Sequence, residues 1–286
     1  MKRPLPILFI LVLFLTPSGL ASKISLTTTV SAEIMLKENS TVSIELLNSG
    51  DEPAFNLKLS FTSECFNSEP IFIQKLDPGK SFKGMINVSL KKEIGEGNHP
   101  LVLFTDYTDM NGYPFSSVSP LMIVYKTPTI SRVSGILSDV NLNKDTKKLK
   151  LILRNLDEVE HEVKVRLFLP RELDCDKTEM NISLEPKSER TLEFRVSNLG
   201  ALEGSSYVVL ASIEYEEANK HYSSFANGMV KITEKKHANF PEWLPFLSIA
   251  LLFMIFIYYS SRKLFKMRIR LGGSREYEVQ AIEKFV

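Results

Sequence analysis

Few side chains in this sequence have the type and spacing that metal binding requires. Its four histidines are His99, His161, His221 and His237, and no two of them stand three or four residues apart. Paired zinc ligands within one element usually have such a spacing, so we expect the histidines to be surface or turn residues. Two cysteines cannot form a thiolate metal site by themselves. The sequence therefore predicts no metal centre.

Motifs for covalent catalysis and nucleotide binding are equally weak. No serine lies in the Gly-x-Ser-x-Gly elbow of hydrolases. Gly79-Lys80-Ser81 resembles the end of a phosphate-binding loop, but Gln74 stands where that loop needs its first glycine. We expect a solvated β-turn there, and we predict no catalytic residue, no cofactor and no enzyme activity.

Five acidic residues near the ends of expected hairpins could bind calcium through their oxygen atoms. They are Asp106, Asp109, Glu214, Glu216 and Glu217. Acidic residues in loops are more often simply solvated, so calcium binding stays an open alternative.

The elements that would position these side chains are β-strands. Apolar side chains occupy every second position in residues 42–46, 55–61 and 163–167. Such alternation packs one face of a strand on a core and leaves the other in water. Turn residues such as Asn111-Gly112 separate the runs. Short strands at this spacing predict an all-β protein built from β-sandwiches.

The middle of the chain is an internal repeat. Four pairs of segments align at an offset of 107 or 108 residues: Val42–Asn48 with Leu149–Asn155, Leu76–Pro78 with Leu184–Pro186, Asp106-Tyr107 with Glu214-Tyr215, and Ser116-Ser117 with Ser223-Ser224. Four matches in order indicate a duplicated unit. We predict two tandem Ig-like β-sandwiches, residues 22–126 and 127–234, joined by a short linker that restricts their relative motion.

One segment of the first unit resembles a known signature. Residues 48–57, Asn-Ser-Gly-Asp-Glu-Pro-Ala-Phe-Asn-Leu, resemble the N-x-G-x-x-x-A-x-N-V pattern of Ig-like repeats in archaeal and bacterial surface proteins, and Leu76–Gly79 resembles their L-x-P-G turn. These are the CARDB and NEW3 type domains, and the resemblance implies adhesion-like modules in series before a membrane anchor. The second unit departs from the pattern at Leu156-Asp157 and at Lys187.

Cys65 and Cys175 each follow the strand after the Asn turn of their own unit. Equivalent positions in consecutive sandwiches would lie a domain length apart, whereas a disulfide needs Cα atoms within about 7 Å. We therefore expect an interchain disulfide or two free thiols. Three sequons, at Asn39, Asn87 and Asn181, could carry glycans.

Two apolar stretches bracket the repeat. Residues 1–21 have a basic start, an apolar run and small residues up to Ala21, which is the order of a cleaved secretory signal. Residues 235–242 form a polar stalk, and residues 243–261 hold no charge and are long enough to span a membrane as one helix. Residues 262–286 form a basic tail. The residues expected at the membrane interface are Trp243, Tyr258, Tyr259, Arg262, Lys263, Lys266, Arg268 and Arg270.

The basic tail predicts orientation, because excess Lys and Arg stay on the cytoplasmic side. The repeat would then lie outside the cell membrane in a single-pass type I topology. The whole chain is only +1, so the outer part is mildly acidic and nucleic acid is not an expected partner.

These features predict a non-enzymatic cell-surface protein whose ectodomain mediates protein interaction or adhesion. Its partners would be membrane lipid, through one helix, and an unknown extracellular protein or glycan. One alternative is an accessory subunit of a membrane complex such as a transporter. Another is an envelope carbohydrate-binding module that uses exposed Tyr107, Tyr113 or Tyr215 to stack on sugar.

Overall fold

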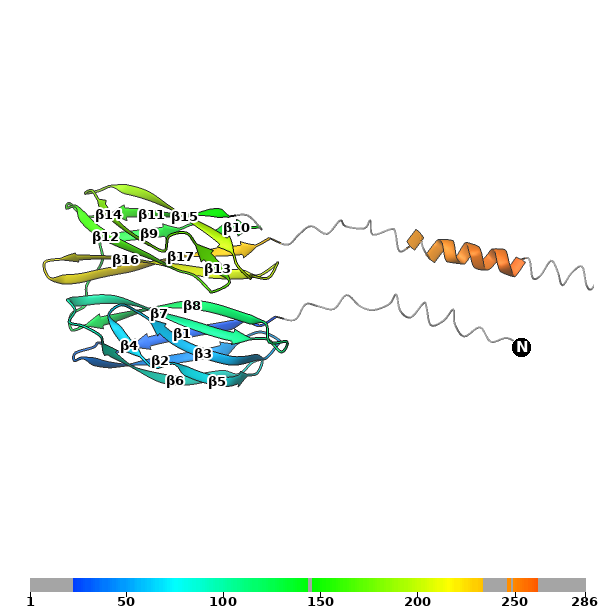
Figure 1. Cartoon of the computed structure of the whole chain (residues 1–286), viewed down its shortest axis with the longest axis horizontal. Coiled ribbons are helices and arrows are strands. Elements are labelled where there is room, and N and C mark those ends of the chain that lie inside the picture. The colour runs from blue at the N-terminus through cyan, green and yellow to red at the C-terminus, as the bar shows by residue number, and fades with distance from the viewer. Residues whose placement is uncertain (1–22, 144–145, 234–245, 248, 262–286) are drawn as a thin grey trace, which may run out of the picture. The chain divides into compact units, whose positions relative to one another are not determined.

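Seventeen β-strands lie within residues 26–232 and no helix occurs among the described residues of this range, which confirms the all-β prediction (Figure 1). The structure, a computed structural model, describes residues 23–143, 146–233, 246–247 and 249–261. The predicted signal sequence (residues 1–21), the predicted stalk, the basic tail and Trp243 lie outside these residues.

The first sandwich contains eight strands: β1 (Leu26–Ala32), β2 (Asn39–Asn48), β3 (Ala54–Thr62), β4 (Phe66–Ser68), β5 (Ile71–Leu76), β6 (Ser81–Leu90), β7 (Glu96–Thr108) and β8 (Pro114–Tyr125). One sheet has the order β1-β2-β6-β4, and the facing sheet has the order β5-β3-β7-β8. Neighbouring strands within these sheets are antiparallel.

The second sandwich contains nine strands: β9 (Val133–Leu137), β10 (Val140–Leu142), β11 (Lys147–Asn155), β12 (His161–Phe168), β13 (Leu173–Cys175), β14 (Glu179–Leu184), β15 (Glu189–Asn198), β16 (Ser206–Glu217) and β17 (Lys220–Ile232). Its sheets have the orders β9-β11-β15-β13 and β14-β12-β16-β17. Each position matches its counterpart in the first sandwich, so the sequence repeat corresponds to one structural unit.

A buried asparagine marks the repeat at the atomic level. Asn48 donates from its side-chain amide to the carbonyl of Leu76 at 3.0 Å, and Asn155 donates in the same way to Leu184 at 3.1 Å. Both side chains are fully buried. Buried amides need such partners, so each asparagine ties the end of one sheet to the turn that leaves the opposite sheet.

Each sandwich has its own apolar core between its two sheets. Val42, Ile44 and Leu46 of β2 meet Leu57 and Leu59 of β3 in the first core. In the second core, β11 contributes Leu149, Leu151 and Leu153, which pack against Val163 and Val165 of β12. The alternation of the sequence therefore selected the core-facing residues of β2 and β12 correctly. In β3 it is wrong at Phe55, because the strand register shifts between Phe55 and Lys58 and Ala54 takes the core position instead.

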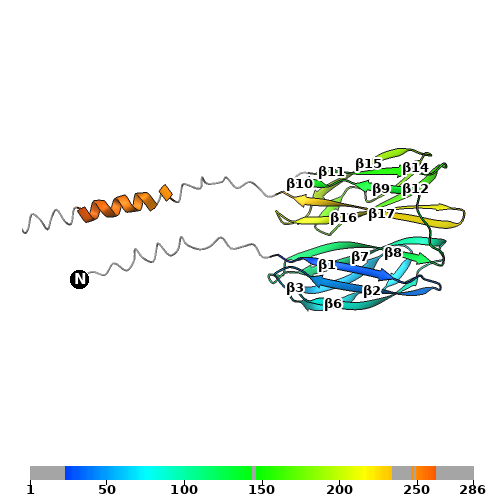
Figure 2. The same ribbon diagram turned by 180° about the vertical axis from the view of Figure 1, so that it is seen from behind.

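The two sandwiches also pack against each other through a seam between their β7–β8 and β16–β17 hairpins (Figures 1 and 2). Residues 99–103 of β7 and 209–215 of β16 are buried without a break. A third apolar cluster joins Val102 and Val118 of the first sandwich to Leu210 of the second. Both faces of the strands are covered in these buried segments, because the other sandwich packs on the face that points away from the core.

The linker between the sandwiches is fixed by hydrogen bonds. Thr129 donates from its hydroxyl to the carbonyl of His221 at 2.7 Å. The side-chain amide of Asn98 donates to the carbonyl of Thr129 at 2.8 Å. Nearby, β17 and β7 form a short parallel pair in which His221 lies opposite Gly97. A linker residue therefore bonds to both sandwiches at once.

Residues 246–247 and 249–261 are helical and belong to a second compact unit of the chain. In the described part of the chain, no helix meets the length and hydropathy expected of a membrane span. The predicted span 243–261 includes residues that the structure does not describe, and it stays a prediction. Tyr258 and Tyr259 lie on this helix with exposed side chains.

Candidate functional site at the seam

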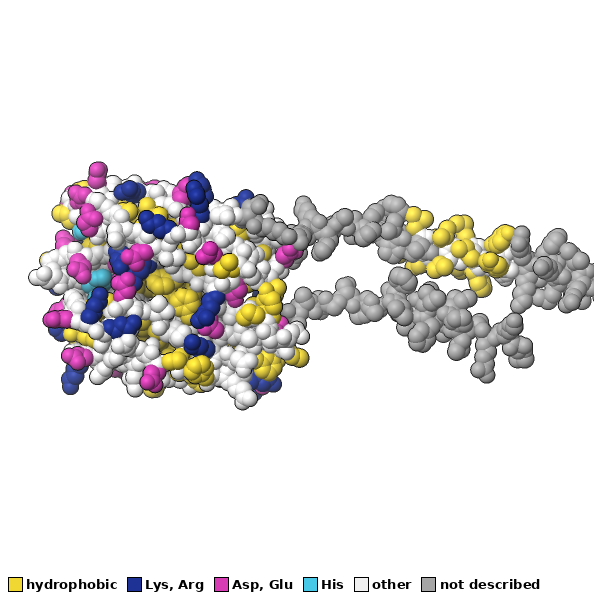
Figure 3. Space-filling model, viewed as in Figure 1, with side chains coloured by type: hydrophobic (Ala, Val, Ile, Leu, Met, Phe, Trp, Pro, Cys, Tyr) yellow, Lys and Arg dark blue, Asp and Glu magenta, His cyan; other side chains and the backbone are white. Residues whose placement is uncertain are grey.

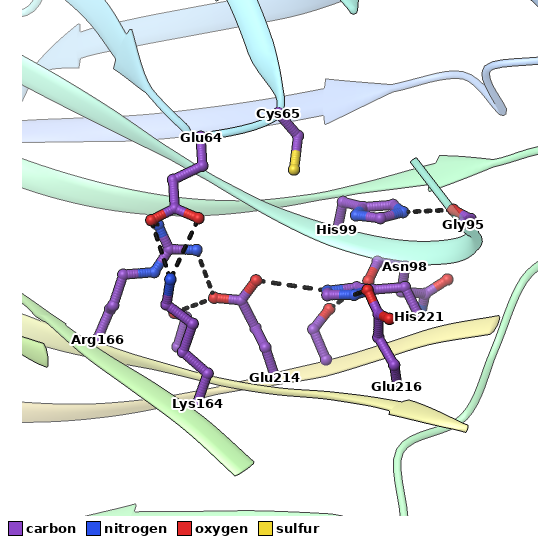
Figure 4. A network of polar contacts seen from close by, with 12 residues as sticks. Glu64, Cys65, Gly95, Asn98, His99, Lys164, Arg166, Glu214, Glu216 and His221 are labelled. Carbon is purple, nitrogen blue, oxygen red and sulfur yellow. Dashed lines mark hydrogen bonds and ion pairs between the residues drawn. The ribbon is translucent and has the colours of Figure 1, made fainter. Parts of the chain in front are cut away.

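A cleft of about 430 Å³ opens where the two sandwiches meet (Figure 4). Both sandwiches line it, and most of the side chains around it are charged or titratable. The lining residues are Glu64, Cys65, Lys92, Glu93, Ile94, Gly95, His99, Glu162, Lys164, Arg166, Glu214, Tyr215, Glu216 and His221.

A loop and several strands from both sandwiches position these side chains. Glu64 and Cys65 come from the loop between β3 and β4, and His99 comes from β7. Lys164 and Arg166 come from the face of β12 that points away from its own core, because core-facing Val163, Val165 and Leu167 alternate with them. Glu214 and His221 come from the β16–β17 hairpin. Strand alternation therefore directs the polar row of β12 into the seam rather than into water.

Arg166 of the second sandwich forms two ion pairs, one across the seam to Glu64 and one within its own sandwich to Glu214. Its Nη1 lies 2.8 Å from Oε1 of Glu64, and its Nη2 lies 2.9 Å from Oε1 of Glu214. Lys164 adds a 3.1 Å ion pair to Glu64. Glu64 is half-exposed, whereas Arg166 and Glu214 keep only 15% and 6% of their side-chain surface accessible. Buried pairs of this kind are costly to break from one side, because a buried charge is then left uncompensated.

Glu214 is ionised despite its burial. Burial by itself would raise its pKa, but hydrogen bonding to His221 and the positive charge of Arg166 outweigh that effect and lower the pKa. The hydroxyl of Ser212 also donates to Oε1 of Glu214 at 2.8 Å. A buried carboxylate with three partners is a fixed negative charge at the base of the cleft.

His99 and His221 stack across the seam. Their ring centroids lie 4.2 Å apart and the ring planes differ by 7°. Nε2 of His99 lies 2.8 Å from the carbonyl oxygen of Gly95, which can only accept, so this nitrogen carries the hydrogen. Burial, with the adjacent His221, lowers the pKa of His99 to about 4. His99 is therefore neutral at physiological pH.

The expected surface position of the histidines is wrong for three of them. His99 and His161 are almost fully buried, and the side chain of His221 is only 11% exposed. His237 lies outside the described residues. The sequence could not reveal the stack, because 122 positions separate its two members and neither strand carries a local pairing signal.

Cys65 and Cys175 are free thiols in the structure, each half-buried. Burial raises the pKa of both. Because the thiolate is the reactive form, these thiols are poorly activated at neutral pH. Only Cys65 lines the cleft, and the interchain disulfide stays a prediction.

The acids considered for calcium fall into separate places. Glu214 lies in the cleft, and Asp106 pairs at 2.8 Å with Arg171 elsewhere on the seam. Asp109 accepts hydrogen bonds from the backbone amides of Asn111 and Tyr113 and so stabilises the β7–β8 turn. Glu216 and Glu217 are exposed. The structure therefore does not gather the five as one calcium site.

The three sequon asparagines all have exposed side chains. Asn39 begins β2, Asn87 lies in β6 and Asn181 lies in β14. These positions leave room for a glycan, and glycosylation stays a prediction.

A second groove on the seam, of about 420 Å³, is lined by aromatic residues. The rings of Tyr107 and Phe115 stack with their centroids 5.5 Å apart. The ring centroid of Tyr113 lies 5.3 Å from that of Phe115. Tyr113 also donates to the carbonyl of Gly200 at 2.5 Å and thereby crosses the seam. Tyr215, by contrast, is buried and lies outside this groove.

Comparison with known proteins identifies no family. No family model matches the chain, and no curated protein matches it. Among solved structures, the YadV chaperone is 10% identical over 70% of this chain and 98% of its own, with a TM-score of 0.29. The periplasmic chaperone SfaE is 11% identical over 72% of this chain and 100% of its own, at 0.29. A protein of unknown function from Porphyromonas gingivalis W83 is 12% identical over 72% and 99%, at 0.28. At these identities and TM-scores the likeness carries no argument, and the sandwich assignment rests on the sheets themselves.

Proposed function

We propose that this chain is a single-pass surface protein whose two sandwiches act as one rigid, non-enzymatic binding body outside the membrane. The signal-like residues 1–21, the apolar stretch 243–261 and the CARDB- and NEW3-like signature support the location. The packing at the seam supports the idea that the two sandwiches act as one body. The ligand is another macromolecule, which docks on loops of both sandwiches.

The observation that carries this proposal is the face-to-face packing of the two hairpins. An apolar cluster lies in the seam, the Arg166–Glu64 ion pair crosses the seam in the cleft, and the Asp106–Arg171 pair crosses it in the second groove. Loops from different sandwiches are therefore held at a fixed spacing. A preorganised surface loses little conformational freedom on binding, which favours affinity.

The seam cleft is the surface that suits a protein partner. Basic and acidic side chains are interspersed over this face of the two sandwiches (Figure 3). The cleft is lined by Lys92 and Lys164 as well as by Glu64, Glu162 and Glu216. Mixed charges of this kind give orientation and specificity to a protein interface.

Photocrosslinking in intact cells tests the docking site. Benzoylphenylalanine at Glu216, which lines the cleft and is exposed, should capture one discrete partner. The same group at Met85, which is 73% exposed on the first sandwich but outside the cleft, should not. Equal capture from both positions, or capture from Met85 alone, would contradict docking at the seam.

Protease treatment of sealed cells tests the topology. Added protease should digest residues 23–233 and leave the last 25 residues protected. Protection of the sandwiches with loss of the tail would reverse the topology. Replacing residues 243–261 by a poly-leucine helix should leave partner capture intact, whereas its loss would favour an accessory subunit that binds through the helix.

The aromatic groove supports carbohydrate binding as a second candidate. Rings of Tyr107, Tyr113 and Phe115 lie beside polar Asn56 and Arg171, and aromatic faces bind sugar rings well. Glycan-array binding that is abolished by Phe115→Ala and retained in Glu216→Ala would favour this candidate over a protein ligand.

A further inference from the structure

The core of the second sandwich ends in a cluster of three potential metal ligands. One ligand atom from each of Asp157, His161 and Glu217 lies within 4.8 Å of the other two. Asp157 belongs to the loop after β11, His161 begins β12, and Glu217 ends β16. None of them lines the seam cleft or the aromatic groove.

The strand register explains how two of them meet. β12 and β16 are antiparallel, with Lys164 opposite Glu214. The same register, continued by three residues, places His161 opposite Glu217. Side chains alternate along a strand, so His161 lies on the face that carries core residue Val163. The two ligands therefore occupy the last position of the core-facing rows.

Neighbouring groups hold two of the ligands in place. The imidazole of His161 is 4% exposed and lies against the ring of Tyr215, with centroids 4.3 Å apart. Tyr215 is itself fixed, because its hydroxyl accepts a hydrogen bond from the amide of Arg132 at 3.0 Å. Oδ1 of Asp157 accepts a hydrogen bond from the backbone amide of Glu158 at 2.8 Å. The other oxygen, Oδ2, faces the imidazole of His161.

These two ligands form a long hydrogen bond in the structure, and its length also matches the spacing of two ligands on one cation. Nε2 of His161 lies 3.3 Å from Oδ2 of Asp157. A strong hydrogen bond between imidazolium and carboxylate spans about 2.7–2.9 Å. Two atoms that each lie about 2.0–2.1 Å from a tetrahedral zinc ion are about 3.3–3.4 Å apart. A zinc ion could therefore replace the hydrogen bond without a change in the separation of the two atoms.

The internal repeat gives a second, independent observation. Asn48 and Asn155 are equivalent, so Gly50 and Ala54 are the first-sandwich counterparts of Asp157 and His161. Ala54 is fully buried. The fold therefore needs only a small apolar side chain at that position, and the buried imidazole of the second sandwich is an addition that the architecture does not require.

We propose that Asp157, His161 and Glu217 bind one divalent first-row transition-metal ion, with zinc as the best fit and water as the fourth ligand. The imidazole nitrogen disfavours calcium and magnesium, which take oxygen ligands, while one nitrogen and two carboxylates suit zinc. The two carboxylates neutralise the charge of the ion. The ion ties the β11–β12 loop to the β16–β17 hairpin.

Metal binding to the purified full-length chain in detergent tests the proposal. After removal of metal with a chelator, titration should show one zinc ion bound per chain. Cobalt at the same site should give the visible absorption of a four-coordinate ion, and calcium in excess should not displace zinc. Zinc should also raise the melting temperature.

Matched variants test whether these residues bind the ion. Glu217→Gln changes an exposed side chain, and His161→Ala introduces the residue that the first sandwich has; each should weaken zinc binding about tenfold or more. Asp109→Asn, at the first-sandwich position equivalent to Glu217, and His237→Gln should leave the affinity unchanged. The proposal is overturned if the wild-type chain binds no zinc, if Glu217→Gln binds zinc as tightly as wild type, or if calcium displaces zinc. Because Glu217 is exposed, that variant decides the matter even if His161→Ala fails to fold.

Discussion

At the residue scale, Arg166 is the centre of the seam cleft because it contacts carboxylates from both sandwiches. Replacing it by methionine keeps most of its volume but leaves Glu214 buried with its cationic partner removed. We expect Arg166→Met to lower the free energy of unfolding by about 3–5 kcal/mol, measured by urea denaturation of the full-length chain.

Arg154→Met is the matched control for this prediction. Arg154 pairs with Glu189 at 2.7 Å, and both side chains are about half-exposed. Exposed pairs contribute little, so the control should lose less than about 1 kcal/mol. Equal losses in the two variants would show that burial does not set the strength of the Arg166 pairs.

His99 makes stability depend on pH. Its pKa is about 4 in the folded chain and about 6.5 when unfolded, so the unfolded chain binds more protons between these values. Its contribution is complete above pH 6.5 and is lost as pH falls toward 4, to a total of roughly 3 kcal/mol. The lowered pKa of Glu214 acts in the same direction, since stability is lost as that carboxylate becomes protonated.

Denaturation midpoints at several pH values between 7 and 4.5 test this dependence. We expect His99→Gln to flatten the decline relative to wild type, while His237→Gln keeps the wild-type slope. A parallel decline in wild type and His99→Gln would assign the pH dependence to other groups.

At the element scale, the short parallel pair of β7 and β17 depends on Gly97. A Cβ atom at this position would lie 2.0 Å from the carbonyl oxygen of His221, and the φ angle of 140° disfavours other residues. Gly97→Ala should therefore separate the strands and lower the free energy of unfolding by about 2–4 kcal/mol.

Gly200→Ala is the control, because no atom lies within 4 Å of the Cβ position there. Thermal melts of the two variants should differ by several degrees, with Gly200→Ala close to wild type. Equal melting temperatures would show that the seam adjusts to a side chain at Gly97.

Local sequence signals predicted these elements better than their surroundings. Alternation identified the core rows of β2 and β12 and part of that of β3, and the Asn111-Gly112 pair correctly marked the β7–β8 turn. The same alternation left Lys164 and Arg166 assigned to solvent. The sequence pattern of an outward-facing row is the same whether water or another sheet covers that row. Only the packed structure could therefore place these two residues.

At the scale of the whole molecule, the apolar cluster of the seam should make the two sandwiches unfold together. Val102, Val118 and Leu210 are nearly fully buried where the sandwiches meet. Calorimetry of the full-length chain should show one transition for the sandwiches. Leu210→Asp buries a charge in the seam and should split this transition into two.

Two separated transitions in the wild type would mean that the seam contributes little to stability. A single transition in Leu210→Asp, shifted to lower temperature, would mean that the sandwiches remain coupled through the ion pairs and the linker. The first result would weaken the argument that the seam holds the binding loops rigidly, and the second would assign the coupling to the polar contacts of the seam rather than to its apolar cluster.

The sequence by itself determined the β class, the duplicated unit and the core-facing rows, because strand alternation, turn residues and a repeat offset are local properties of the chain. Only the tertiary structure decided that the sandwiches pack through their β7–β8 and β16–β17 hairpins, that His99 stacks on His221, and that Arg166 joins Glu64 to Glu214. The stack and the Arg166–Glu64 pair join residues about a domain apart in sequence. Their energy comes from burial between two finished sheets, and no short segment of the chain carries a signal for that.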